Sequence, residues 1–345
     1  MSDNEQAGAV PQRRSFIKKV AAGSAVLGGA AAGFFGDVDP ATGSFGLPQA
    51  HAADAPLKMA FIEWQPHTVP AAWSKGIEEV LKDQQTIQYK LLDGQNKVEV
   101  QVSLMDTLIN EGTSVIFLQP IDSVALAPSI NKAKRAGIAV ITLNIDATAA
   151  HAAHVEMSHY FGAMDIARVM GEKMGGKGEV AILNAPPGII IRDQRTNGFV
   201  DGMKKHHPNI KIVADQVADW SRKKAQDVLS TILAAKPGLG GAYGVNDSMA
   251  LGAVDVAKEK GLLGKMVIFG NDGEKDALES IEKGELTGTQ YTDVYQQGRF
   301  AASAATVLAS GGVPATAFKK QSHLLMPYLI ATRETVGQIQ PNQRW

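Results

Sequence analysis

The apolar pattern of residues 240–273 predicts two buried strands and a helix in the order of a βαβ unit. The apolar run Gly241–Val245 ends in the polar pair Asn246–Asp247, and a helical segment follows. A second apolar run, Met266–Phe269, ends in Asn271–Asp272. Continuous apolar runs, without alternation, are typical of parallel strands that are buried on both faces. Ligands of such sheets bind beyond the carboxyl ends of the strands, which is where both polar pairs are expected.

Four motifs resemble the ribose-type sugar-binding proteins of bacterial ABC transporters, which are type I periplasmic binding proteins. In the order of that family they are VITLN at 140–144, RTNGF at 195–199, ADW at 218–220 and NDSMALGA followed by VIFGNDG at 246–273. The resemblance extends over most of residues 57–330. It implies an α/β fold of two doubly wound parallel-sheet lobes, which are joined by a hinge of three chain crossings.

The resemblance also predicts how the chain is divided between the lobes. Residues 1–52 precede the fold, the N-terminal lobe takes 53–157 and 293–322, and the C-terminal lobe takes 158–292 and 323–345. The crossings are the boundaries between these ranges. Two sets of strand–helix units favour two lobes over a single (β/α)₈ barrel.

The pattern of apolar runs places further elements before and after the βαβ unit. Strands are expected at Leu57–Glu63, Ile87–Leu92, Ser114–Leu118, Ala139–Leu143, Val180–Leu183, Ile210–Val217 and Glu285–Tyr291. Helices are expected at Val98–Asn110, Val124–Arg135, Phe161–Met174, Ile190–Lys205 and Tyr295–Ala309.

Residues 1–52 resemble a twin-arginine export signal. Arg13–Arg14 precede the weakly apolar run Val20–Gly36, and Ala50–His51–Ala52 gives an A-x-A cleavage pattern. Charge, apolar run and small-residue site follow the order of an export signal, and the run is too weakly apolar for a comfortable membrane span. We expect export to the periplasm and a soluble mature protein that starts near Ala53. The alternative is a tail with a chance arginine pair.

Composition excludes several classes of function. The chain has 345 residues, of which 45% are hydrophobic, so it can bury one large or two medium cores. A net charge of -1 gives no basic field for nucleic acid. Cysteine is absent, which excludes disulfides, thiolate metal sites and a lipid-modified N-terminal cysteine. No P-loop, G-x-G-x-x-G, G-x-S-x-G or Ca²⁺ loop occurs, so we expect binding without catalysis and no cofactor.

The segment His151–His159 (HAAHVEMSH) leaves two interpretations open. Its histidines and Glu156 suggest a metal site, but the H-x-E-x-x-H spacing is not the i, i+4 pair that places two imidazoles on one helix face. The resemblance places the first crossing between lobes here. A hinge segment is therefore favoured over a metal site.

The resemblance implies ligand contacts at the ends of the strands. Asn246 and Asp272 match contact positions of the family, and Asn144 follows the fourth strand at another. The alternative for Asn246 and Asp272 is helix capping, for which Asp247 is the better candidate. Trp220 follows a strand of the second lobe, where the family places an aromatic ring against its ligand; the alternative is that it covers the next helix start.

The loop after the first strand departs from the family. Ribose-type members usually have an Asn and two aromatic residues there, whereas this chain has HTVP at 67–70. Trp64 is the expected stacking partner from the first lobe, with Glu63 and His67 as polar contacts.

Two further contact positions are ambiguous. The ligand-facing arginine of the family aligns nearest to Asp193; we select Arg192 and expect Arg195 to pair structurally. Near a lobe crossing, Gln290 and Thr292 compete with Asp293 for one contact.

These features predict a periplasmic substrate-binding protein that delivers a small sugar, sugar alcohol or cyclitol to the membrane permease of an ABC importer. We expect a monomer. The alternative is a receptor that presents a sugar-like signal to a membrane sensor. A transcriptional repressor is disfavoured because residues 1–52 show no helix-turn-helix pattern, and an enzyme is the weakest option.

Selectivity is predicted from the residues after the fourth strand. Ribose-type relatives have Asp–Arg there, whereas this chain has Asn144–Ile145. A hydrogen bond to a charged group contributes about 1.5–3 kcal/mol, against about 1 kcal/mol for a neutral one. We therefore expect a neutral polyhydroxy ligand other than ribose, glucose or galactose.

Overall fold

The computed structural model describes residues 56–84, 86–309 and 322–345. The export signal expected in residues 1–52, with Arg13–Arg14 and its cleavage site, lies outside the described residues. The described strands form two separate six-stranded sheets. Among these residues, no helix combines the length and the apolar character needed to cross a membrane.

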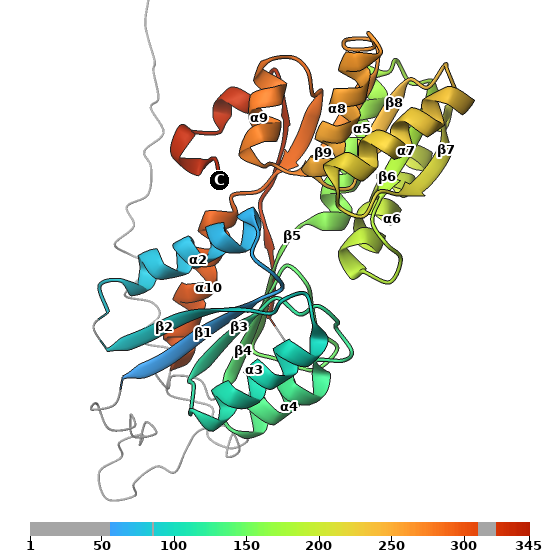
Figure 1. Cartoon of the computed structure of the whole chain (residues 1–345). Helices are drawn as coiled ribbons and strands as arrows, with labels where there is room; N and C mark the ends of the chain where they lie inside the picture. Colours follow the sequence, from blue (N-terminus) through green and yellow to red (C-terminus); the bar gives the residue numbers. More distant parts are fainter. Residues whose placement is uncertain (1–55, 85, 310–321) are drawn as a thin grey trace, which may run out of the picture. The chain divides into compact units, whose positions relative to one another are not determined.

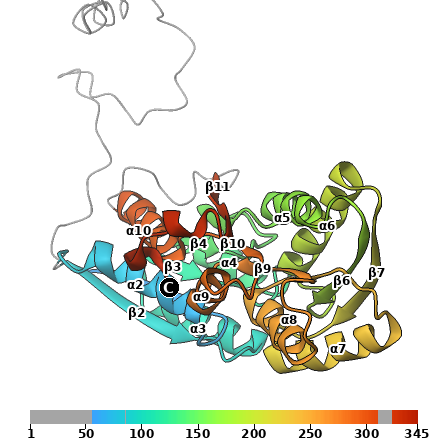
Figure 2. The ribbon, with the colours of Figure 1, turned by 90° about the horizontal axis from the view of Figure 1, so that it is seen from above.

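The first sheet is parallel throughout and has the order β11-β5-β4-β3-β1-β2. Its strands are β1 (Leu57–Glu63), β2 (Ile87–Asp93), β3 (Val115–Leu118), β4 (Ala139–Leu143), β5 (Ala153–Met157) and β11 (Ser322–Met326). Helices α2 (Thr68–Leu81) and α10 (Val294–Ala309) lie side by side on one face (Figures 1 and 2). Helices α3 (Val98–Asn110) and α4 (Ala127–Arg135) lie on the other.

Strand β3 shows why the sequence of this sheet reads as continuous apolar runs. Val115 and Phe117 belong to the core under α2 and α10, whereas Ile116 and Leu118 belong to the core under α3 and α4. All four are fully buried. Neither face of the strand reaches solvent, so no polar alternation is needed.

Close packing of α2 against α10 depends on glycine. A Cβ atom at Gly298 would lie 2.2 Å from the Trp73 carbonyl oxygen, and one at Gly76 would lie 2.1 Å from that of Tyr295. Trp73 is fully buried and its Nε1 donates to Gln297 Oε1 at 2.8 Å. The two helix backbones therefore touch directly.

The second sheet has the order β12-β10-β9-β8-β6-β7, in which only β12 is antiparallel to its neighbour. Its strands are β6 (Gly178–Asn184), β7 (Ile210–Val217), β8 (Gly241–Gly244), β9 (Val267–Asp272), β10 (Gly288–Tyr291) and β12 (Leu329–Thr332). Its helices are α5 (His159–Lys173), α6 (Ile190–His206), α7 (Arg222–Ala235), α8 (Asp247–Glu259) and α9 (Lys275–Glu282). The predicted βαβ unit is confirmed as β8–α8–β9.

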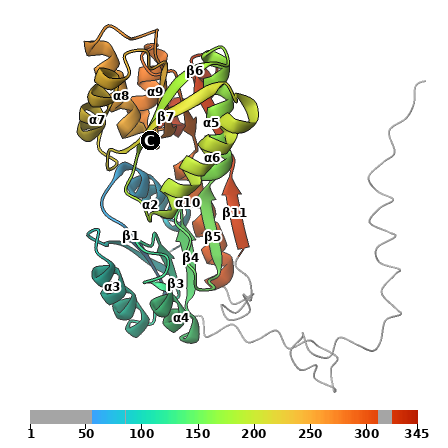
Figure 3. The ribbon, with the colours of Figure 1, turned by 90° about the vertical axis from the view of Figure 1, so that its right-hand side faces the viewer.

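Strand β5 was not expected. It lies in the segment His151–His159, interpreted above as a hinge, and pairs with β4 on one side and β11 on the other. Figure 3 shows β11 beside β5. The crossing predicted at Ser322–His323 is therefore wrong, because both residues pair with β5 in the first sheet. At this last crossing the chain passes to the second sheet between β11 and β12.

Candidate functional site

Polar side chains from both sheets are joined by successive hydrogen bonds. His159 at the start of α5 lies with Nε2 2.7 Å from Asn144 Oδ1, just after β4. Arg195 in α6 donates from Nε to His159 Nδ1 at 3.2 Å and from a terminal nitrogen to Asp272 Oδ1 at 2.5 Å. We call these four residues the Asn144–Asp272 network. It connects the end of β4 in the first sheet with the end of β9 in the second.

The network determines which nitrogen of His159 carries hydrogen. Burial, followed by the charge of Arg195, holds the pKa of His159 well below its usual value, so the imidazole is neutral. A guanidinium can only donate, so Nδ1 accepts and Nε2 is the donor. Asn144 Oδ1 accepts that hydrogen, which leaves the two Nδ2 hydrogens of Asn144 as donors for another group.

Arg195 is buried, with 2% of its surface exposed, and each of its three side-chain nitrogens donates a hydrogen bond. Besides His159 and Asp272, it donates to the Val245 carbonyl oxygen at 2.6 Å. Arg195 does pair structurally, as the sequence indicated, but its partner is itself a predicted ligand residue. Burial raises the pKa of Asp272, while Arg195, and more weakly His67, oppose that shift. Arg195 thus holds the Asp272 carboxylate in one orientation.

Asn246, not Asp247, caps helix α8. The Asn246 side chain accepts from the backbone N–H of Met249 at 2.9 Å, which uses its Oδ1 and leaves Nδ2 as a donor. The prediction that Asp247 is the cap is wrong. Asp247 is the first helical residue, and its carboxylate points instead toward the end of β9.

The Asp247 carboxylate ties the loop after β9 to β10. Oδ2 accepts from the backbone N–H groups of Gly273 at 2.7 Å and Glu274 at 2.8 Å, and Oδ1 accepts from Thr289 Oγ1 at 2.6 Å. Burial, followed by the nearby Asp272, raises the pKa of Asp247 to about 7. Asp247 therefore supports the backbone next to Asp272.

Positive backbone φ angles occur at several of the predicted ligand residues. Among the described non-glycine residues, six have positive φ, and three of these are Asn144 at 64°, Trp220 at 57° and Asp272 at 125°. Such conformations are uncommon for any residue with a side chain, and a bulky residue there is an outlier. Backbone strain of this kind is concentrated at binding and catalytic sites.

Several buried polar atoms in the described residues have no hydrogen-bond partner in the protein. Four of them belong to predicted ligand residues, namely Arg192 Nε, Trp220 Nε1, Gln290 Oε1 and Thr292 Oγ1. Buried polar groups are normally paired, so each such atom requires an explanation.

Gln290 also lies at a close contact between two elements. A Cβ atom at Gly162 of α5 would lie 1.9 Å from Gln290 Oε1, and Gln290 Nε2 donates to the Ser158 carbonyl oxygen at 3.5 Å. This side chain therefore packs where the chain leaves the first sheet.

The three residues predicted from the first loop have different surroundings. Trp64 Nε1 donates to Asn96 Oδ1, in the loop after β2. Burial, followed by the charge of Asp93, raises the pKa of Glu63 to about 7. His67 is exposed and influences Asp272 electrostatically. Of the three, His67 is the one that the structure relates to the Asn144–Asp272 network.

Arg195 and His159 are candidate site residues that the sequence does not predict as ligand contacts. Arg195 belongs to the RTNGF motif, where a structural pair is expected, and His159 ends the segment expected to be a hinge. The signal available was the motif itself. Its arginine comes three residues after Arg192, on nearly the same side of α6.

Two doubly wound sheets, with strand ends from both sheets linked through polar side chains, define a two-lobed α/β binding protein of the type I periplasmic binding protein fold. The chain belongs to the periplasmic binding protein domain family, whose sequence profile matches residues 62–312. The resemblance to ribose-type members is confirmed by the relatives described next.

The xylitol-binding protein of Mycolicibacterium smegmatis is 30% identical over 67% of this chain, and the chain spans 65% of that protein's length. The ribose import binding protein of Bacillus subtilis is 29% identical, in an alignment that covers 69% of this chain and 76% of that protein's length. An ABC transporter periplasmic solute binding protein from Actinobacillus succinogenes, solved with bound D-allose, has 26% identity and a TM-score of 0.74. That alignment covers 82% of this chain and 99% of the other.

Proposed function

We propose that this chain is a periplasmic substrate-binding protein that captures a small neutral sugar, sugar alcohol or cyclitol and delivers it to the permease of an ABC importer. The Asn144–Asp272 network is the observation that carries the proposal. The groups that the bonds of the network do not use are the Nδ2 hydrogens of Asn144 and the Asp272 oxygen that does not contact Arg195. A hydroxyl both donates and accepts, so neighbouring hydroxyls on one ligand can satisfy an amide and a carboxylate together.

The remaining ligand contacts are proposed from the buried polar atoms that have no hydrogen-bond partner and from the residues at the strand ends. Asn246 offers a donor that its capping bond does not use, and Thr292 offers a buried hydroxyl with no partner in the protein. Trp220 would cover an apolar face of the ligand and donate its Nε1–H to it. Arg192, Gln290, Glu63, Trp64 and His67 complete the proposed ligand-binding set.

The names of the relatives support this ligand class. They specify xylitol, ribose and D-allose, which are all small, neutral and polyhydroxylated. Within that class we propose a ligand other than ribose, glucose or galactose, because Asn144 is neutral and Ile145 is apolar. The guanidinium of Arg195 does not replace the missing charge, because Asp272 already neutralises it.

Calorimetric titration of the purified protein with xylitol, myo-inositol, ribose, glucose and galactose tests the proposal. We expect a sugar alcohol or cyclitol to bind at least tenfold more tightly than the three aldoses. Submicromolar binding of ribose or glucose would contradict the selectivity argument. Binding of none of these compounds, nor of a wider set of sugars and polyols in a thermal-shift screen, would contradict the function itself.

Export by the twin-arginine route is part of the proposal and rests on Arg13–Arg14. Replacing both with Lys retains the charge but should leave the precursor in the cytoplasm, as measured by cell fractionation. Normal periplasmic levels of that variant would contradict this route.

Closure of the two lobes on the ligand, in a monomer, is also proposed. Three passages of chain join the sheets, after β5, β10 and β11, and hinge closure is well attested for binding proteins. Small-angle X-ray scattering should give a smaller radius of gyration with saturating ligand at a monomeric mass. An unchanged radius or a dimeric mass would count against these expectations.

A further inference from the structure

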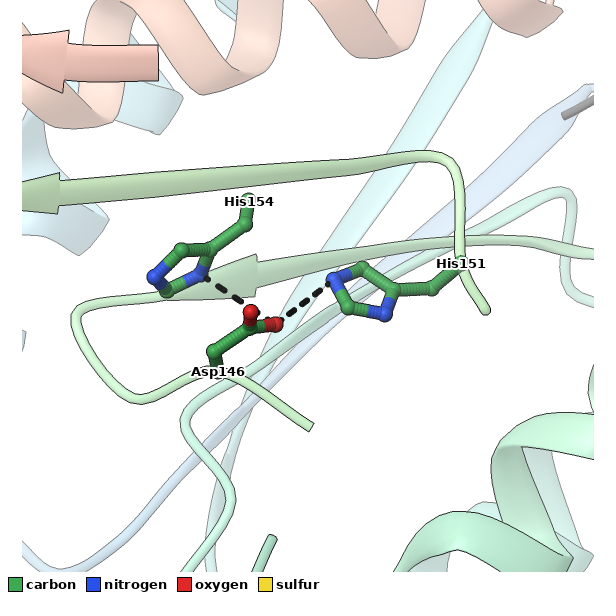
Figure 4. A group of neighbouring side chains, drawn as sticks. All are labelled: Asp146, His151 and His154. Atoms are coloured by element: carbon green, nitrogen blue, oxygen red, sulfur yellow. Dashed lines mark ion pairs between the residues drawn. The ribbon is translucent and has the colours of Figure 1, made fainter. Parts of the chain in front are cut away.

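Asp146 and His151, in the connection between β4 and β5, converge with His154 of β5 on one point. Asp146 Oδ1 lies 3.2 Å from His151 Nε2 and 4.0 Å from His154 Nδ1. Figure 4 shows the two rings directed at the carboxylate from opposite sides. Both histidine side chains are fully buried, whereas 27% of the Asp146 side chain is exposed. A small solute can therefore approach past Asp146.

Hydrogen bonding determines which nitrogen of His151 faces this point. Its Nδ1 lies 2.7 Å from the Ala149 carbonyl oxygen. A carbonyl oxygen can only accept, so Nδ1 carries the hydrogen. The other ring nitrogen, Nε2, faces Asp146 Oδ1 at 3.2 Å.

The same reasoning applies to His154. Its Nε2 lies 3.0 Å from Glu156 Oε2, and a carboxylate accepts, so Nε2 carries the hydrogen. Nδ1 of His154 faces the same point as Nε2 of His151. In both rings, one nitrogen is oriented by an acceptor and the other faces Asp146 and Thr142.

The hydroxyl of Thr142 lies between the two ring nitrogens that face Asp146. Its Oγ1 lies 2.8 Å from His151 Nε2 and 2.8 Å from His154 Nδ1, but it has one hydrogen to donate. Asp146 is paired with His151, whose hydrogen bond is among the contacts that lower the pKa of Asp146. A divalent cation at this point would replace the hydrogen between the two side chains and take both, together with His154, as ligands.

We propose that Asp146, His151 and His154 bind a divalent transition metal ion, with Zn²⁺ preferred. Two imidazole nitrogens and a carboxylate oxygen are a donor set suited to zinc. Ligands at about 2.0–2.1 Å in a tetrahedron are about 3.4 Å apart, so the distances of 3.2 and 4.0 Å need only a small adjustment. Hydrogen bonds from the outer imidazole N–H groups to a carbonyl and a carboxylate are typical of metal-binding histidines.

A second group nearby is a weaker candidate. His154, Glu156 and His323 also lie within coordinating distance of one another. A metal there would need His154 Nε2 as a ligand, and that nitrogen already donates its hydrogen to Glu156. In the first group, the ion would join Asp146 and His151, in the connection that follows β4, to His154 of β5, and would stabilise that connection.

Zinc titration of the untagged full-length protein against a chromophoric chelator tests the proposal. We expect one equivalent to bind, and Asp146→Asn and His151→Gln each to weaken binding at least tenfold. Glu156→Gln should weaken it about 10- to 100-fold, as is usual for residues that orient a ligand. Asp146→Asn retains an oxygen for the Ala147 N–H, which donates to Asp146 Oδ1 at 2.7 Å, so it should fold.

Two histidine variants serve as matched controls. His206→Gln removes an exposed histidine of α6, and His323→Gln removes the histidine of the second group. Neither should change zinc affinity. Loss of binding in His323→Gln would place the metal in the second group and overturn the proposal, as would absence of one-equivalent binding.

Nitrogen-15 NMR with and without one equivalent of Zn²⁺ provides a readout that does not depend on the variants. We expect the metal to shift the Nε2 resonance of His151 and the Nδ1 resonance of His154, while Nδ1 of His151 and Nε2 of His154 keep their hydrogens. Unchanged resonances of these two nitrogens would overturn the proposal. Tetrahedral Co²⁺ absorption bands that disappear in Asp146→Asn would support the assignment.

Discussion

Arg195 and Asp272 form an ion pair at 2.5 Å, in which their side chains are only 3% and 11% exposed. The pair joins α6 to the end of β9, and His159 extends it to Asn144 at the end of β4. Buried ion pairs of this kind fix geometry more than they add stability, because desolvation offsets the attraction. In this protein the ion pair fixes the orientation of the Asp272 carboxylate at the end of β9.

Removing Asp272 should cost both stability and ligand affinity. In Asp272→Ala the guanidinium of Arg195 stays buried without its counter-ion, and breaking a buried pair costs about 3–5 kcal/mol. Urea unfolding should show this loss. The matched control is Asp227→Ala, which breaks the exposed pair with Lys223 and should change little, because exposed pairs contribute little. Wild-type affinity in Asp272→Ala would remove Asp272 from the site.

The buried carboxyl of Asp247 should make stability fall as pH rises. Its pKa is raised from 3.8 to about 7, so the folded state binds this proton more tightly than the unfolded state. The resulting stabilisation is complete below pH about 4 and is lost as pH rises through 7. One such group changes the free energy of unfolding by up to about 1.4 kcal/mol per pH unit.

Asp247→Asn should flatten this pH dependence. The amide can still accept from the two backbone N–H groups and can donate to Thr289 Oγ1, so the fold should persist. Urea unfolding between pH 4.5 and 7 compares the slopes, with Asp227→Asn on the surface as control. Equal slopes in wild type and Asp247→Asn would show that Asp247 is ionised throughout.

Variants of Asn246 should separate capping from ligand binding. Asn246→Asp retains an oxygen for the Met249 N–H but loses the Nδ2 donor, so ligand affinity should fall while stability is retained. Asn246→Ala should lose both, with a capping cost of about 0.5–2 kcal/mol. Ser221→Ala removes the cap of α7, where Ser221 accepts from Lys224 N–H, and should cost stability alone. A normal affinity in Asn246→Asp would leave Asn246 with only its cap role.

Gly298→Ala should destabilise the first lobe. The added Cβ would lie 2.2 Å from the Trp73 carbonyl oxygen, so α2 and α10 would have to separate, and overpacking typically costs about 1–3 kcal/mol. Gly238→Ala is the matched control, because its Cβ would meet nothing within 4 Å. Thermal unfolding should show a lower midpoint for Gly298→Ala only. Equal midpoints would mean that the helix pair tolerates the methyl group.

Most of the fold follows from the sequence because the strands are buried on both faces. The bounds predicted for β1, α3, β4 and β7 agree with the structure. Strand β5 was missed because His154 and Glu156 interrupt its apolar run, although both are buried. Their burial depends on a hydrogen bond to each other, and local sequence does not reveal such a partner.

The candidate site was only partly predictable for a related reason. Strand ends identify Asn246 and Asp272 without knowledge of packing, because parallel strands place their carboxyl ends at one edge. Arg192 and Arg195 are three residues apart on one helix, so only tertiary packing decides which one is buried. The sequence could not show that the structural pair of Arg195 would be Asp272.

The identity of residue 144 should control the preference between polyols and aldoses. Asn144→Asp keeps an oxygen for the His159 N–H, which lies 2.7 Å from Asn144 Oδ1, and replaces the amide donor with a charged acceptor. A charged hydrogen bond exceeds a neutral one by about 0.5–2 kcal/mol, so ribose should bind about tenfold more tightly. The matched control is Asn197→Asp, which adds the same charge at an exposed position of α6. Calorimetry on wild type and both variants measures the change. An equal gain in ribose affinity in Asn197→Asp would mean that net charge, and not the site, determines that affinity. No gain in Asn144→Asp would mean that residue 144 does not set the preference between polyols and aldoses.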